Sequence, residues 1–230
     1  MKLDFTFTIK IWRVLMGNYL REPINGFTHL AGAVLSFIGL LALVIKTTIN
    51  NPSTIALTAV IIFGVSMILL YTASATYHLV VSSDKVVSFL RRLDHAMIFI
   101  LIAGSYTPFC LIALDGSIGW VLFGLITLIA VTGVSFKLIW FNCPRWISTI
   151  IYVGMGWIAI FLIVPLYNAL SLQGILLLVG GGIFYTIGAV IYATKPKALK
   201  FKNFGYHEIF HIFIMLGTLT HFICVFKYVI

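Results

Sequence analysis

Long apolar runs separated by short polar breaks occupy the chain from residue 26 to its C-terminal end. Each run contains roughly 20 mainly apolar residues, the length that an α-helix needs to cross a hydrocarbon core about 30 Å thick. The runs are too long and too continuous for the strands of a membrane β-barrel, which alternate over about ten residues. We therefore predict seven transmembrane helices, at about 26–45, 54–80, 93–113, 117–139, 146–166, 172–193 and 207–228.

Turn-forming residues separate these runs, as expected for loops between helices. Examples are Asn50-Asn51-Pro52, Asn142-Cys143-Pro144 and Lys195-Pro196-Lys197. No internal repeat is evident, and no polar stretch is long enough to fold separately. The predicted fold class is therefore all-α: a polytopic integral membrane protein in which residues 1–25 form a short arm and residues 26–230 form one seven-helix domain.

The N-terminal arm is cationic, with Lys2, Lys10, Arg13 and Arg21 among short apolar stretches. A cleaved signal peptide is not expected, because it requires a continuous apolar core followed by a small-residue cleavage site. Two interpretations stay open for the arm: an element that lies on the membrane surface, or an unstructured tail.

Basic residues are distributed unequally between the two sides that seven helices create. The arm and the second, fourth and sixth loops carry thirteen Lys and Arg residues, including Lys85, Arg91 and Arg92 in the second loop, whereas the other side carries Lys46 and Lys227. Cytoplasmic loops are enriched in Lys and Arg. We therefore expect a cytoplasmic N-terminus and a C-terminus outside the cell. The outer loops are too short for a folded extracellular domain.

Composition agrees with a membrane protein and excludes other classes. Hydrophobic residues make up 61% of the 230 residues and charged residues only 9%, whereas soluble domains carry about 25% charged residues. A soluble enzyme, a disordered chain and a nucleic-acid-binding domain are thereby excluded. The three cysteines, an odd number without a Cys-x-x-Cys pair, do not indicate a disulfide framework or a cysteine metal site.

Ionisable side chains within a membrane span are costly, by about 2.5–3.5 kcal/mol each on insertion scales, and therefore require a reason. Four of them fall at one depth near the cytoplasmic side: His78 ends the second helix, Asp94 lies in the first turn of the third, and His207 and His211 begin the seventh. His207 and His211 are four residues apart and share a helix face. Ser74 lies one turn before His78 on the same face.

Three neutral imidazoles and one carboxylate at one depth are the groups that a zinc site requires, since three protein ligands and an open fourth position are typical of catalytic zinc. Zinc lowers the pKa of a bound water toward about 7. In this hypothesis His78, His207 and His211 bind the metal, Asp94 holds and deprotonates the water, and Ser74 contacts the ligands or a substrate oxygen. Alternatively, each histidine forms a hydrogen bond with a neighbouring helix or faces interfacial water.

The remaining ionisable residues in the spans receive other interpretations. His29 is expected at the interface, although it could support the metal ligands. His95 points away from Asp94 toward another helix, and His221 lies about 15 Å beyond His211 along the helix, too far to share its metal. Glu208 is expected to cap the loop or to face the surface.

At these residues the sequence resembles the hemolysin III family, the bacterial branch of the progestin and adipoQ receptor superfamily. The resemblance covers almost the whole chain, in segments Glu22–His29, Ser74–His78, Leu93–His95, Ala103–Phe109 and Phe204–His211. It implies seven helices with a cytoplasmic N-terminus, zinc held by His78, His207 and His211, a water linked to Asp94, and Ser74 beside it. Related adiponectin receptors and alkaline ceramidases are regarded as zinc-dependent lipid amide hydrolases, whereas the family name implies membrane lysis.

Three functions follow as expectations. The leading one is a zinc-dependent hydrolase of a lipid-like amide or ester, located in the cell membrane and acting on membrane lipid. The second is a receptor or signalling protein with structural zinc. The third is a cytolytic, channel-like protein, which the scarcity of polar residues along the helices disfavours. The substrate and the oligomeric state are left open.

Overall fold

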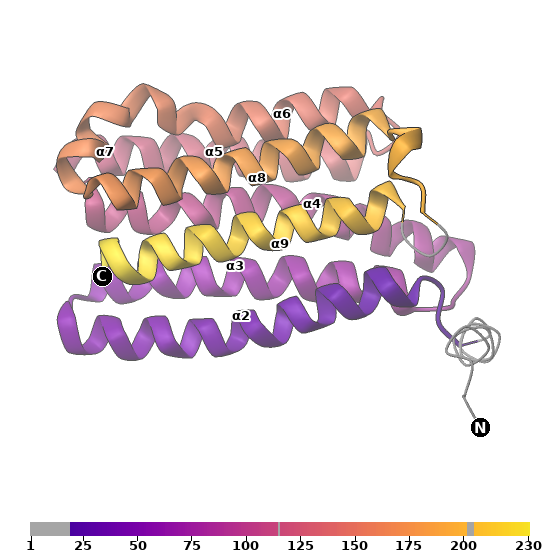
Figure 1. Cartoon of the computed structure of the whole chain (residues 1–230), viewed down its shortest axis with the longest axis horizontal. Coiled ribbons are helices and arrows are strands. Elements are labelled where there is room, and N and C mark those ends of the chain that lie inside the picture. Colours follow the sequence, from indigo (N-terminus) through magenta and orange to yellow (C-terminus); the bar gives the residue numbers. More distant parts are fainter. Residues whose placement is uncertain (1–18, 115, 202–204) are drawn as a thin grey trace.

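The computed structural model describes residues 19–114, 116–201 and 205–230, and these residues form a bundle of helices without strands (Figure 1). The predicted arm at 1–25 lies mostly outside the described residues. Seven helical stretches are long and apolar enough to cross a membrane, which confirms the predicted all-α, seven-helix fold. They are Pro23–Asn50, Thr54–Leu79, Asp84–Ala113, Gly116–Ile139, Arg145–Ala169, Leu172–Thr194 and Tyr206–Val229.

Several of these stretches contain more than one type of helical turn. The third consists of α4 (Asp84–Pro108) and the π-helical segment η1 (Phe109–Ala113), and the seventh of α9 (Tyr206–Cys224) and η4 (Val225–Val229). The fifth consists of α6 (Arg145–Trp157), η2 (Ile158–Leu162) and α7 (Ile163–Ala169). The remaining helices are α2 (Pro23–Asn50), α3 (Thr54–Leu79), α5 (Gly116–Ile139), α8 (Leu172–Thr194) and the short η3 (Lys197–Leu199).

The helices close into a ring. α2 contacts α3, α3 contacts α4, and α4 contacts both α5 and α6. α6 contacts α8, α8 contacts α9, and α9 contacts α2. In Figure 1 the yellow α9 therefore lies next to α8, and the same contacts bring it against α2. The first and last spans of the chain thus meet, which allows residues about 180 positions apart to share one site.

Apolar side chains cover the outside of the bundle as well as its core. Phe63 and Leu43 are buried between helices, whereas Leu128, Val164 and Leu176 are more than half exposed. In a membrane such outward-facing side chains contact lipid, so close packing between helices depends on small residues. Gly181 provides one such approach, because a Cβ there would overlap the ring of His221.

The prediction for the third span was wrong at its beginning. This helix starts at Asp84 rather than near residue 93, so Lys85, Arg91 and Arg92 lie within α4 and not in a loop, and Asp94 lies about three turns into the helix rather than in its first turn. The apolar pattern marks only the part of a helix in hydrocarbon, and helical turns can continue into the polar interface. An acidic residue in the first turn, here Asp84, favours such a start.

Orientation in the membrane stays a prediction of the charge distribution. A reporter fused after Ile230 is expected to be active outside the cell, and one fused at Lys85 is expected inside, because most basic residues lie at the end that contains Lys85. Paired alkaline phosphatase and fluorescent protein fusions at the two positions measure this. A cytoplasmic signal from the C-terminal fusion contradicts the prediction.

Candidate metal centre

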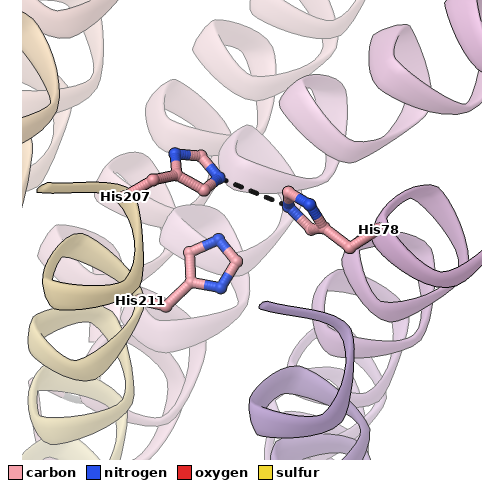
Figure 2. Close-up of side chains that lie close together, drawn as sticks. All are labelled: His78, His207 and His211. Atoms are coloured by element: carbon pink, nitrogen blue, oxygen red, sulfur yellow. Dashed lines mark hydrogen bonds between the residues drawn. The ribbon is translucent and has the colours of Figure 1, made fainter. Parts of the chain in front are cut away.

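Three histidine rings point toward one another, as Figure 2 shows. His78 comes from the last turn of α3, and His207 and His211 come from the first two turns of α9. One ring nitrogen from each lies within 4.8 Å of the others, an arrangement that could hold a metal ion. His78 and His211 are buried, with 1% and 2% of their surface exposed, and His207 is half-buried. The structure therefore brings together the three residues that the sequence predicted as metal ligands.

Glu22 determines which nitrogen of His78 faces the other rings. Its Oε2 lies 2.7 Å from His78 Nδ1, and a carboxylate can only accept, so Nδ1 carries the proton. The lone pair of Nε2 is then directed toward His207, whose Nε2 lies 3.4 Å away. That separation is longer than an ordinary N–H···N hydrogen bond. Paired with a carboxylate in this way, a histidine is oriented as metal-binding histidines typically are.

The backbone places Glu22 at this position. The amide of Glu22 donates to the carbonyl of His78 at 2.8 Å, and that of Arg21 donates to Leu79 at 3.3 Å. The Arg21 side chain donates to the Tyr77 carbonyl at 2.5 Å. These contacts occupy carbonyl groups that the C-terminus of α3 would otherwise leave without partners. The segment before α2 is thereby held against the end of α3.

Glu22 itself lies outside the membrane spans and is ionised at neutral pH. The hydrogen bond from His78, together with one from Asn25 and the charge of Arg21, lowers the pKa of Glu22 to about 2, although partial burial acts in the opposite direction. Sequence reasoning missed this residue because the search for costly ionisable groups considered only the spans. The position of Glu22 directly before the helix-starting Pro23 is the signal that could have identified it.

His29 is buried, with 3% of its surface exposed, so it faces the interior of the bundle rather than interfacial water. Its ring stacks on that of His211, with centroids 3.7 Å apart and planes 11° apart. Both ring nitrogens of His29, and Nδ1 of His211, are buried without a hydrogen-bond partner. The closure of the ring between α2 and α9 explains the burial, because it covers the face of α2 that bears His29. The stacked pair limits the orientations available to the His211 ring.

Ser74 and Asp94 face the same space as the cluster. A cavity of about 170 Å³ is lined by both of them together with His29, His207 and His211. Ser74 is buried, and the side chain of Asp94 is 15% exposed. The carboxylate of Asp94 does not belong to the group of possible ligand atoms that lie within 4.8 Å of one another. Its carboxylate lies 3.7 Å from His95 Nδ1.

The other ionisable residues have structural partners. His95 Nδ1 faces the Arg91 carbonyl at 2.7 Å, and its Nε2 faces the Tyr192 hydroxyl of α8 at 3.0 Å, so it meets another helix as predicted. His221 Nε2 lies 3.0 Å from the Leu178 carbonyl. Glu208 accepts from the Gly205 amide at 2.8 Å and caps α9, which agrees with its predicted capping role.

A second cavity, of about 190 Å³, continues from the first into the bundle. The two cavities share Ser105, Tyr106, Trp157 and His221 among their lining residues, and the second is otherwise bounded mainly by apolar side chains such as Phe109 and Leu166. The polar histidine end is therefore next to an apolar interior that could accept a hydrocarbon chain.

Comparison with known proteins agrees with this architecture. The family model described as Haemolysin-III related matches residues 18–222. Hemolysin-3 of Bacillus cereus is 39% identical over 218 residues, which cover 94% of this chain and 95% of that protein. The Hemolysin-3 homolog of Bacillus subtilis (strain 168) is 37% identical over 90% of this chain and 93% of its own. Heptahelical transmembrane protein 5 of Arabidopsis thaliana is 31% identical over 65% of this chain and 44% of its own.

Proposed function

The chain belongs to the haemolysin-III related family of multi-pass membrane proteins, and from that premise we propose that it is a zinc-dependent hydrolase of a lipid-like amide or ester. Its location is a bacterial plasma membrane. The observation that carries the proposal is the convergence of His78, His207 and His211 beside a cavity that Ser74 and Asp94 also line.

The donor set fits zinc. Zinc binds imidazole nitrogens at about 2.0–2.1 Å in tetrahedral geometry, which places two such nitrogens roughly 3.3 Å apart. The Nε2 atoms of His78 and His207 are 3.4 Å apart. Glu22 leaves the Nε2 lone pair of His78 available, and His211 Nδ1 is buried without a partner. These features support zinc bound by the three histidines.

Zinc in this position supplies a Lewis acid that polarises a carbonyl group and lowers the pKa of water. The protein side chains then carry the proton transfers. Asp94 accepts the proton of the attacking water and delivers it to the leaving amine or alcohol. The Ser74 hydroxyl donates to the carbonyl oxygen of the substrate, on which negative charge develops. The continuous apolar cavity accepts the hydrocarbon chain and excludes bulk water from the site.

Fatty-acid release tests the proposed activity. Purified protein in phosphatidylcholine nanodiscs is incubated with a panel of ceramides, N-acyl amides and acyl esters, and released fatty acid is measured by mass spectrometry. We expect turnover of at least one class, loss of turnover after chelation, and recovery on addition of zinc. Stoichiometric zinc without fatty-acid release above the chelated sample contradicts the hydrolase function.

A cytolytic function is the alternative that the names of the bacterial relatives favour. Dye-loaded vesicles distinguish the two functions when the same protein is added to them. Dye release without fatty-acid release supports a pore, whereas fatty-acid release from vesicles that retain the dye supports the hydrolase.

The replacement Glu22→Gln is expected to weaken zinc binding by about 10–100-fold, the usual consequence of removing a carboxylate that orients a metal-binding histidine. The fold is expected to persist, because the backbone contacts that hold the segment do not involve the side chain. Competition with a fluorescent zinc chelator measures the affinity. Glu208→Gln is the matched control, since its carboxylate caps α9 rather than contacting a histidine. Equal affinities for the two variants contradict the orienting role of Glu22.

A further inference from the structure

A cluster of cations lines the first cavity near the histidines. It consists of Arg91 on α4, Lys137 in the last turn of α5 and Arg145 at the start of α6. We refer to these three residues as the basic cluster. Phe141, from the loop between α5 and α6, and Tyr192 of α8 line the same part of the cavity.

Lys137 is the most enclosed member of the basic cluster. Only 3% of its surface is exposed. The polar contact of its ammonium group is to the thiol of Cys143, with Nζ and Sγ 3.4 Å apart, and a thiol is a weak acceptor. Cys143 Sγ in turn lies 3.1 Å from the Ser148 hydroxyl. Lys137 falls within the predicted span 117–139, and in the structure it is buried near the end of α5 and borders the cavity.

Each of the three cations lies against one of two aromatic rings, Phe141 or Tyr192. Arg91 Cζ lies 5.1 Å from the centroid of Phe141, and Lys137 Nζ lies 5.9 Å from the same centroid. Arg145 Cζ lies 5.6 Å from the centroid of Tyr192. Cation–π contacts of this kind retain the charge and leave the N–H donors available to an anion.

No member of the basic cluster forms an ion pair with a carboxylate of the described residues, although Asp94 lines the same cavity. Among the described residues the ion pairs within 4.0 Å are Arg21–Glu22, His78–Glu22 and His95–Asp94, and none includes a member of the basic cluster. Positive charge that merely follows membrane topology is expected on the outer surface, where Lys85, Arg92 and Lys195 are exposed. A buried ammonium group without a carboxylate partner is costly and indicates a role in binding.

Tyr192 connects the basic cluster to the candidate metal centre. Its ring centroid lies 6.1 Å from that of His207 and 5.6 Å from Arg145 Cζ. Tyr192 is therefore adjacent to both the basic cluster and the candidate metal centre. The apolar second cavity adjoins the first.

We propose that the basic cluster binds the phosphate of an anionic lipid whose hydrocarbon chain extends into the apolar cavities. A phosphate offers several acceptor oxygens, which match the donors of two guanidinium groups and one ammonium group. The hydroxyls of Ser148 and Thr149 border the same cavity. The inference deepens the proposed hydrolase function, on which it rests for calling this lipid a substrate, but binding of the head group is measured without turnover.

Binding of decyl phosphate tests the site. The full-length protein, in uncharged maltoside micelles, is titrated by microscale thermophoresis with decyl phosphate, decanol, decyltrimethylammonium and inorganic phosphate. We expect decyl phosphate to bind at least about tenfold more tightly than each of the other three, because charge-assisted hydrogen bonds favour the anion. Inorganic phosphate that binds as tightly as decyl phosphate identifies a site for free anions and overturns the lipid proposal.

Substitutions locate the head group. Lys137→Gln is expected to weaken decyl phosphate at least about tenfold and to leave decanol unchanged, and Arg145→Gln provides the same test at a less buried position. The control Lys85→Gln removes an exposed charge from the same end of the bundle and is expected to have no effect. Affinity that persists in both Lys137→Gln and Arg145→Gln overturns the proposal.

Chelation separates this proposal from the metal. Decyl phosphate is expected to bind the chelated protein within about twofold of its affinity for the untreated protein, since the basic cluster is intact in both. If chelation abolishes the binding of decyl phosphate and Lys137→Gln leaves it unchanged, the metal binds the anion. That result overturns the proposed role of the basic cluster. Conversely, if the untreated protein contains no zinc and takes none up when zinc is added, yet still discriminates decyl phosphate from decanol, the proposed hydrolase is refuted while the head-group site is supported.

Discussion

Replacement of both His207 and His211 with alanine is expected to remove zinc from the purified protein, which we expect to hold one zinc ion per chain before the change. Both residues project from one face of α9 and provide two of the three converging nitrogens. A single imidazole from His78 does not form a site, because zinc requires at least three protein ligands. The affinity is expected to fall by more than about 100-fold, beyond the effect of losing a supporting carboxylate.

Elemental analysis by mass spectrometry gives the zinc content, and chelator competition gives the affinity. His221→Gln is the matched control, because it removes an imidazole from the same helix while retaining a donor for the Leu178 carbonyl. Circular dichroism and gel filtration establish that the variants are folded, and His207→Ala alone replaces the double variant if that variant is not. Full zinc occupancy in the folded double variant rejects the assignment of these ligands.

The substitution Asp94→Asn is expected to retain zinc and to reduce hydrolysis by about 10²–10⁴-fold, the usual contribution of a positioned general base. Asparagine preserves the shape of the side chain but does not accept a proton at neutral pH. Metal retention is expected because Asp94 lies outside the converging group of nitrogens. The rate of fatty-acid release and the zinc content are measured on the same preparation.

Two outcomes contradict the role of Asp94 as a base. Loss of zinc together with a lower melting temperature indicates that the carboxylate anchors the metal directly, as expected for a structural site. Retained zinc with unchanged turnover indicates that another group accepts the proton.

Much of the fold follows from the sequence, because a bilayer requires spans of similar length and apolar character. All seven spans were predicted, and the largest error, at the start of α4, arose where the helix extends beyond its apolar part. Hydropathy measures preference for hydrocarbon rather than the ability to form a helix. The ring arrangement that joins α2 to α9 could not be predicted, because apolar side chains lie on both the packed and the outward-facing sides of these helices.

The same physical reasoning found some site residues and missed others. His78, His207 and His211 were identified because ionisable groups within apolar runs are conspicuous and because a spacing of four residues fixes a common face. Glu22 was missed because it lies just before a span, and its contact with His78 depends on tertiary packing. Lys137 was missed as a site residue because it lies at the end of an apolar run, and its direction toward the cavity depends on how α5 packs against α4.

X-ray absorption at the zinc edge of the purified wild-type protein tests the central claim most directly. The three-histidine centre predicts one zinc per chain with three nitrogen ligands at about 2.0–2.1 Å and a further light-atom ligand, and imidazole scattering from three rings. A spectrum with sulfur at about 2.3 Å, or a protein that does not take up stoichiometric zinc, would contradict a metal centre formed by His78, His207 and His211.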